Sequence, residues 1–275
     1  MTPLHILILM ATGLVGGFAS GMLGIGGGII MVPVQYLLFN SLMGLPTDTA
    51  IKLALGTNLA VILLTVASGA WRHSRKGAVW WRAAVFLGCF ATLGSVIGAT
   101  IATHLPGEVL KVALGLIISL VSLRMLISKP LQSDQEPKDN LWLWAAWAFP
   151  LGLLTGTLGI GGGALVVPVL VLVLKFPLHK AIATSLGMML FTSAGAATSF
   201  ILNGLGASHL PAYSLGYVHL PSWLLLGVSS MLTAQLGAIA AHRLPARQLT
   251  YIFVAITFYM GLKMLGVFDW LGWPL

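Results

Sequence analysis

Long apolar runs, separated by short polar or proline-containing breaks, cover most of this 275-residue chain. Such runs are typical of helices that enter a hydrocarbon core, where a full span needs about 20 apolar residues. The breaks define five apolar segments in each half of the chain. They are residues 4–22, 28–43, 50–70, 80–103 and 108–127, then 142–158, 163–175, 180–201, 221–241 and 247–267. The pattern therefore predicts an all-α, polytopic membrane protein.

A glycine-rich string occurs twice and indicates an internal duplication. Gly-Ile-Gly-Gly-Gly occupies residues 24–28 and again 159–163, and a Val-Pro pair follows each copy closely. We predict a first transmembrane repeat at 1–127 and a second at 141–275, each with a helical hairpin broken at its glycines. Residues 128–140, polar and with two prolines, are predicted to be a linker.

Basic residues indicate that the two repeats are inverted with respect to each other. Arg72, Arg75 and Lys76 lie in the loop between the third and fourth segments, whereas the equivalent loop of the second half, 203–221, contains no Lys or Arg. Because Lys and Arg concentrate in cytoplasmic loops, the linker is predicted to be cytoplasmic and both termini periplasmic. Tryptophans near segment ends are predicted to be interfacial anchors: Trp80, Trp81, Trp142, Trp144, Trp270 and Trp273.

Composition excludes most other classes of protein. Hydrophobic residues make up 58% of the chain and charged residues only 7%, and the charges that give a formal net charge of +8 are scattered through the loops. We therefore expect contact with membrane lipid and no nucleic-acid partner. The apolar segments carry no acidic residue in their cores, and the histidines lie near segment ends, so we expect no catalytic residue, metal site or cofactor.

The glycine strings predict an anion site. The segment after each string has only about 13 to 16 apolar residues, too few for an untilted span, so each string is predicted to be the tip of a hairpin inside the membrane. The helix that restarts there offers unpaired N–H groups and the positive end of its dipole. Two inverted copies would direct two such ends at one central region. The alternative is that these glycines only permit close helix packing.

Side chains in the apolar segments complete the predicted substrate-binding set. Amides are expensive to bury in lipid without a partner, and both amides and hydroxyls can donate to an oxyanion. The full set is Gly26, Gly27, Gly28, Gly161, Gly162, Gly163, Thr57, Asn58, Thr184, Ser185 and Gln235.

The sequence resembles the TauE/SafE sulfite exporter family, also called the 4-toluene sulfonate uptake permease family. The likeness is carried by GLVGGFASGMLGIGGGIIMVPV at residues 13–34 and by its echo LGLLTGTLGIGGGALVVPVLV at 151–171. It implies a bacterial inner-membrane transporter of small sulfur-containing anions such as sulfite or sulfonates. The family pattern commonly has Thr-Ser in the third segment of both halves; the second half keeps it at 184–185, but the first half has Leu53-Ala54 there and Thr57-Asn58 one turn later.

These observations favour a non-enzymatic secondary transporter that works by alternating access on a small anionic substrate. Two alternatives stay open at this point, a passive anion channel and a non-transporting membrane scaffold. The residues do not select the anion, the direction of transport, a coupling ion or an oligomeric state.

Overall fold

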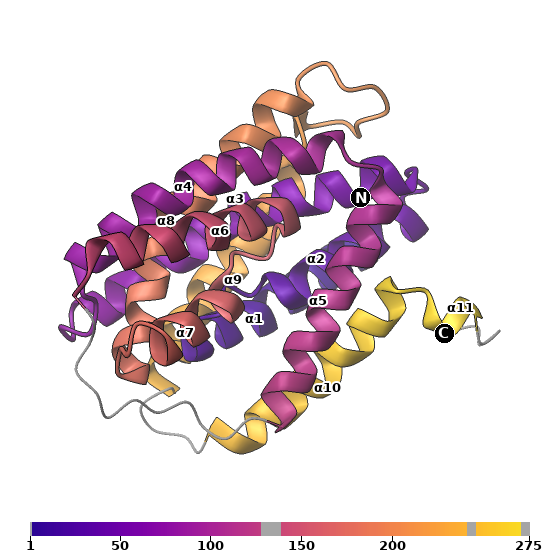
Figure 1. Cartoon of the computed structure of the whole chain (residues 1–275). Helices are drawn as coiled ribbons and strands as arrows, with labels where there is room; N and C mark the ends of the chain where they lie inside the picture. Colours follow the sequence, from indigo (N-terminus) through magenta and orange to yellow (C-terminus); the bar gives the residue numbers. More distant parts are fainter. Residues whose placement is uncertain (1, 128–138, 241–245, 271–275) are drawn as a thin grey trace.

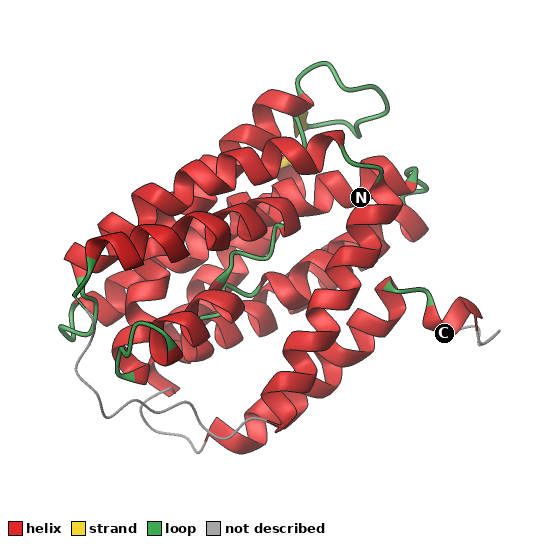
Figure 2. Ribbon diagram, viewed as in Figure 1, coloured by secondary structure: helices red, strands yellow, loops and turns green. Residues whose placement is uncertain are grey.

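The computed structural model describes residues 2–127, 139–240 and 246–270, and most of them are helical (Figure 2). The first half contains α1 (Pro3–Leu23), α2 (Gly28–Leu37), its π-helical continuation η1 (Leu38–Leu42), α3 (Thr47–Ser74), α4 (Trp81–His104) and α5 (Gly107–Ile127). The second contains α6 (Leu141–Leu158), α7 (Gly163–Leu172), α8 (Leu178–Gly204), α9 (Leu220–Ala240), α10 (Ala246–Met264) and α11 (Val267–Trp270). Between α8 and α9, β1 (Ser214–Leu215) pairs antiparallel with β2 (Val218–His219).

Helix length separates full spans from shorter elements. Within the described residues, seven helices are long and apolar enough to cross a membrane: α1, α3, α4, α5, α6, α8 and α9. By contrast, α2 and α7 have 10 residues each, which is about 15 Å of helix against a hydrocarbon core of roughly 30 Å. The ten predicted segments correspond in order to α1–α10, so the prediction of an all-α polytopic membrane protein is confirmed.

A glycine turn interrupts the helical structure between α1 and α2 and again between α6 and α7. Gly27, which precedes α2, has φ 74° and ψ −14°, and Gly162, which precedes α7, has φ 76° and ψ −16°. A left-handed φ costs a residue with a β-carbon about 1–2 kcal/mol, which explains why glycine stands there. Both helices restart at the next residue, as the sequence predicts, and the two turns have nearly the same backbone conformation.

The two halves pack on each other through equivalent pairs of helices. α1, the first helix of one half, packs along α9, the fourth of the other, and α6 packs along α4 in the equivalent way. α3 packs on α8 and α5 on α10 (Figure 1). Glycines allow these helices to approach closely, because a β-carbon at Gly17 would meet the backbone of Ser230 and one at Gly152 the backbone of Ala91.

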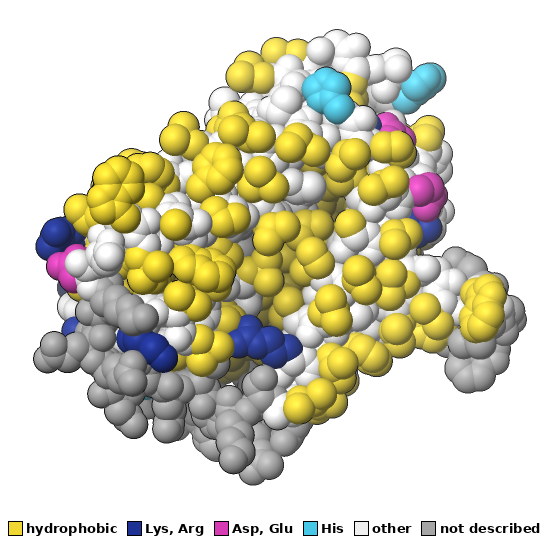
Figure 3. Space-filling view, viewed as in Figure 1, with side chains coloured by type: hydrophobic (Ala, Val, Ile, Leu, Met, Phe, Trp, Pro, Cys, Tyr) yellow, Lys and Arg dark blue, Asp and Glu magenta, His cyan; other side chains and the backbone are white. Residues whose placement is uncertain are grey.

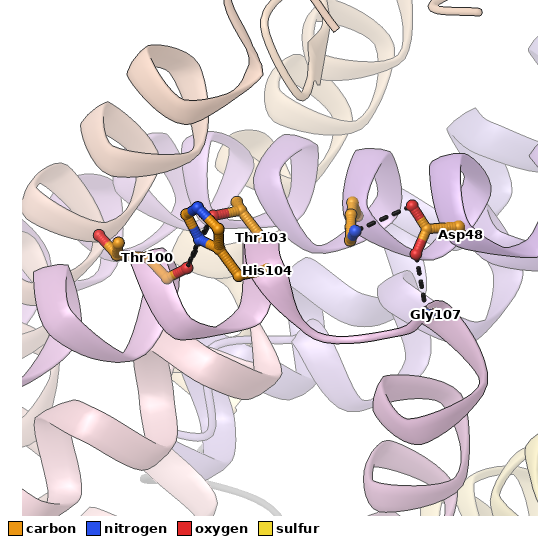
Figure 4. Close-up of polar contacts among 6 residues, drawn as sticks. Asp48, Thr100, Thr103, His104 and Gly107 are labelled. Atoms are coloured by element: carbon orange, nitrogen blue, oxygen red, sulfur yellow. Dashed lines mark hydrogen bonds and ion pairs between the residues drawn. The ribbon is translucent and has the colours of Figure 1, made fainter. Parts of the chain in front are cut away.

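The helices leave charged groups at the two ends of the bundle and an apolar surface between them (Figure 3). At one end, the Gly107 N–H donates to Asp48 Oδ1 at 2.9 Å and ties α5 to α3 (Figure 4). At the other end, Arg82 pairs with Asp139 at 3.2 Å. The N- and C-terminal ends lie on the side of the first contact, away from the α3–α4 connection (Figure 1). The predicted linker lies outside the described residues except for its last two.

One predicted interfacial tryptophan is buried, so that prediction is wrong for Trp144. Its side chain is fully buried, with its ring 5.5 Å from that of Trp80 and 6.2 Å from that of Phe176. The reason is that the start of α6 packs on α4 and on the segment that follows α7. Trp142 and Trp270, each 86% exposed, have the exposure expected of an anchor, and Trp273 lies outside the described residues.

Candidate functional site

The two glycine turns meet in the middle of the bundle. A β-carbon added at Gly28 would lie 2.7 Å from Ile160 Cα, and one added at Gly163 would lie 2.7 Å from Ile25 Cα. These reciprocal approaches mean that the first residue of each short helix lies against the turn of the other half. The turns are therefore in direct contact and closed on each other.

The backbone of both turns carries unpaired donors. In the part of the chain that the structure describes, no acceptor bonds the N–H groups of residues 25–29 or those of residues 160–164. The next N–H groups, those of Ile30 and Met31, do bond to the Gly27 carbonyl. A buried N–H without an acceptor is costly, and each set stands at the positive end of a helix dipole. The arrangement brings two such sets together.

Asn58 lies between the two turns. Its Nδ2 donates to the Gly159 carbonyl at 2.6 Å and lies 2.6 Å from the position of a β-carbon at Gly28. Its side chain is fully buried, and its Oδ1 has no hydrogen-bond partner among the described residues. Ser185 is the counterpart, since its Oγ lies 3.5 Å from the Gly24 carbonyl oxygen, while its shorter hydrogen bond, of 2.8 Å, goes to the Ile182 carbonyl of its own helix. One polar side chain from each third helix thus contacts the turn of the other half.

The structure gives the two candidate threonines different partners from those of Asn58 and Ser185. Thr57 Oγ1 accepts the N–H of His219 at 2.9 Å, and Thr184 Oγ1 accepts the N–H of Trp80 at 3.2 Å. Both hydroxyls therefore hold the segment that precedes a fourth helix. Each of them is one residue away from a side chain that contacts a glycine turn.

Gln235 is a candidate that has no hydrogen bond to the turns among the described residues. It is half-buried on α9, and its neighbour Ala234 lies against Gly21 of α1. Among the described residues, no hydrogen bond joins Gln235 to residues 24–28 or 159–163. The contacts of the two turns bring together the six glycines, Asn58 and Ser185.

Gln35 is a buried amide outside the predicted set. The side chain is fully buried on α2, and neither its Nε2 nor its Oε1 has a hydrogen-bond partner within the described ranges. Ser20 Oγ on α1 is in the same state. The only signal in the sequence is a polar residue inside an apolar run, which does not distinguish a ligand contact from a helix contact.

A wide groove on the surface of the bundle lies away from the turns. It encloses about 820 Å³ between α4 and α8, and its lining includes Thr92, Thr100 and Asn203. Its hydroxyls are already used, because Thr100 Oγ1 and Ser199 Oγ share a hydrogen bond of 3.0 Å and Asn203 donates to the Ser199 carbonyl at 2.8 Å. The end of α4 is capped similarly by His104 (Figure 4). This groove contains none of the predicted site residues.

His219, which immediately precedes α9, gives the fold a dependence on pH. Its ring is buried against Phe39, with centroids 5.6 Å apart, and its Nδ1 shares a hydrogen bond of 2.8 Å with Ser222 Oγ. Burial lowers the pKa of His219 from 6.5 to about 4. The unfolded chain then binds a proton more readily than the folded one, so stability is present above pH 6.5 and is lost as the pH falls toward 4.

We therefore expect the unfolding temperature of the purified protein to fall between pH 6.5 and pH 4, and to fall less in a His219→Gln variant. Differential scanning fluorimetry in detergent measures both. The exposed His104 is the matched control, since a His104→Gln variant should behave like the original protein. An equal fall in the His219→Gln protein would contradict the assignment.

Comparison with known proteins decides the family. The model of the sulfite exporter TauE/SafE family matches residues 9–264. The chain belongs to this family. It is 29% identical over 262 residues to a "Probable membrane transporter protein" of Haemophilus influenzae, covering 94% of this chain and 97% of the relative. A relative with the same description in Methanocaldococcus jannaschii is 26% identical and covers 94% of each chain. No solved structure gave a significant match.

The family and the fold agree on the broad class of the protein. TauE/SafE members are membrane transporters, and the spans described above make this chain a multi-pass membrane protein of that family. Among the residues that the structure describes, no three His, Cys, Asp or Glu side chains lie close enough together to hold a metal ion.

Proposed function

We propose that this protein is a secondary transporter that carries a small sulfur-containing oxyanion, such as sulfite or a sulfonate, by alternating access. The observation that supports it most strongly is the meeting of the two glycine turns, with free N–H groups on both sides and a half-used amide, Asn58, between them. Donors without acceptors, directed at one place from two helix ends, form a site for negative charge that needs no buried Lys or Arg.

The closed contact between the turns fits an occluded conformation of such a carrier. A β-carbon at Gly26 would lie 3.5 Å from the Ile160 carbonyl oxygen and 3.7 Å from Gly161 Cα, so an anion can enter only when the two turns separate. Separation of the turns would expose the N–H groups of both sets at once. Anion binding is thereby linked to the separation of the two turns.

The arrangement of the halves supports inverted repeats at 1–127 and 141–275. α1 and α6 approach the turns from opposite ends of the bundle (Figure 1), and the packing of α1 on α9 is the equivalent of that of α6 on α4. The basic residues near Arg82 lie at the end opposite the termini, which supports a cytoplasmic linker and periplasmic termini in a bacterial inner membrane.

A single methyl group tests the site. Ala at Gly26 adds a β-carbon whose nearest neighbour, Met189 Sδ, is 3.4 Å away, so the added atom fits but occupies the space between the turns. Its cost to folding is the left-handed φ of 80°, about 1–2 kcal/mol. We expect Gly26→Ala to lower anion affinity at least about tenfold, because the turns can no longer present their N–H groups to one solute.

The matched control is Gly44→Ala, which has a φ of 69° and nothing within 4 Å of the added carbon. Anion binding is measured as the rise in unfolding temperature with sulfite, thiosulfate, sulfonates or chloride, since a ligand of the folded state stabilises it by mass action. Equal ligand-dependent rises in the unfolding temperatures of the Gly26→Ala and Gly44→Ala proteins would show that the anion does not bind at the turns.

A further inference from the structure

His219 forms a buried cluster with Thr57 and Phe39 on one side of the glycine turns. Its N–H donates to Thr57 Oγ1 on α3, and its ring stands edge-on to Phe39 in η1. All three side chains are buried, with exposures of 3% or less. This His219 cluster joins the segment before α9 to the third helix of the other half and to the end of that half's short helix.

Trp80 forms a second cluster, with Thr184 and Phe176, through equivalent contacts in the other half. Its N–H donates to Thr184 Oγ1 on α8, and its ring lies 5.2 Å from that of Phe176, which follows α7. This Trp80 cluster joins the segment before α4 to the third helix of the second half and to the segment after that half's short helix. Fully buried Trp144 adds a third ring.

The two clusters lie toward opposite ends of the bundle. The His219 cluster uses the segment that connects α8 to α9, and the Trp80 cluster uses the connection of α3 to α4, which Figure 1 places at the other end. Glycines on the third helices let both segments approach. A β-carbon at Gly56 would meet the backbone of Tyr217, and one at Gly187 would lie 2.9 Å from the β-carbon of Ala84, in the first turn of α4.

Each cluster is joined to the turns by two adjacent residues on a third helix. Thr57 holds His219 while Asn58, the next residue, holds the Gly159 carbonyl. Thr184 and Ser185 repeat the arrangement, with Ser185 on the Gly24 carbonyl. Any movement of a third helix that releases a turn therefore also disturbs the cluster beside it.

We propose that the His219 cluster and the Trp80 cluster are the two gates of the transporter, one on each side of the glycine turns, which open in alternation. The inference rests on the proposed function, because it assumes that a solute reaches the turns. It assigns to His219 and Trp80 the role of barriers that separate the turns from water on either side, with no contact to the solute required.

Accessibility of a cysteine placed at the turns tests the gates directly. Ile160 is 1% exposed and lies beside Gly28, so Ile160→Cys in a Cys89→Ser background reports on water access. The probe is a membrane-impermeant cationic methanethiosulfonate, applied to right-side-out and to inside-out vesicles. We expect His219→Ala to raise the labelling rate about tenfold from the periplasmic side only, and Trp80→Ala from the cytoplasmic side only, because lost ring contacts shift the population toward an open gate.

Matched controls are available at both ends of the bundle. His104→Ala removes an exposed histidine and Trp81→Ala a tryptophan that is 41% exposed, and neither should alter labelling. If an alanine variant is not recovered folded, His219→Gln and Trp80→Phe should give a smaller rise from the same side. Equal rises from both sides, or rates unchanged from the controls, would overturn the gates.

The labelling result and the proposed anion site can fail separately. A cationic probe reports water access whether or not any anion binds. Side-specific labelling with no ligand-dependent stabilisation would therefore support the gates and contradict the anion site. Ligand-dependent stabilisation without side-specific labelling would keep the anion site and overturn the gates.

Discussion

Asn58→Asp is expected to lower anion affinity by about 100-fold or more, the largest effect of any single side-chain change at the turns. The substitution keeps the size of the side chain but replaces the donor that holds the Gly159 carbonyl and puts negative charge beside Gly28. A like charge placed against an anion in a desolvated site costs several kcal/mol. Ligand-dependent rises in unfolding temperature, measured with the anion that stabilises the original protein, give the loss.

The pH dependence of that variant separates charge from shape. A buried carboxyl has a raised pKa and becomes neutral as the pH falls, so anion affinity of the Asn58→Asp protein should recover toward acid pH. Asn40→Asp is the matched control, because the Asn40 amide also donates to a backbone carbonyl, that of Leu45 at 2.9 Å, away from the turns. If the two variants lose the same affinity, or if affinity is independent of pH, the amide does not face the anion.

The hydrophobic pattern was sufficient to predict the elements. Ten apolar segments became α1–α10 because helices in lipid must satisfy their own backbone and so follow the apolar runs closely. The glycine strings predicted both breaks, since few other residues adopt the left-handed φ of Gly27 and Gly162. The burial of Trp144 could not be predicted, because the sequence around a tryptophan near a segment end has the same pattern whether lipid or another helix covers the side chain.

The site was predictable in its backbone and less so in its side chains. The turns come from a repeated string, whereas Thr57, Thr184 and Asn58 are isolated polar residues whose partners depend on which helices meet. The structure accounts for the departure of the first half from the family pattern. Ala54 stands where the second half has Ser185. Asn58, one turn later, contacts the turn of the second half, just as Ser185 contacts the turn of the first half. The burial of His219 could not be predicted from the sequence, because it depends on the α8–α9 connection folding back over α3.

A methyl group at Gly27 or at Gly162 should cost about 2–5 kcal/mol of folding free energy, the sum of a left-handed φ and an overpacked contact. The two positions differ in what the added carbon meets. At Gly27 it would lie 2.7 Å from the carbonyl oxygen of Gly16, which is backbone, whereas at Gly162 it would meet the side chain of Thr155. A side chain can be shortened, but a carbonyl group cannot, so only one of the two variants can be rescued.

We therefore expect Thr155→Ala to restore most of the stability lost by Gly162→Ala, leaving about the strain cost of 1–2 kcal/mol that Gly44→Ala also carries. Ser20 is the counterpart of Thr155 in the first half, and Ser20→Ala should leave the Gly27→Ala protein as unstable as before. Unfolding temperatures of the single and double variants form two matched double-mutant cycles, with coupling in one and none in the other. Equal coupling in both cycles would mean that the two turns pack alike.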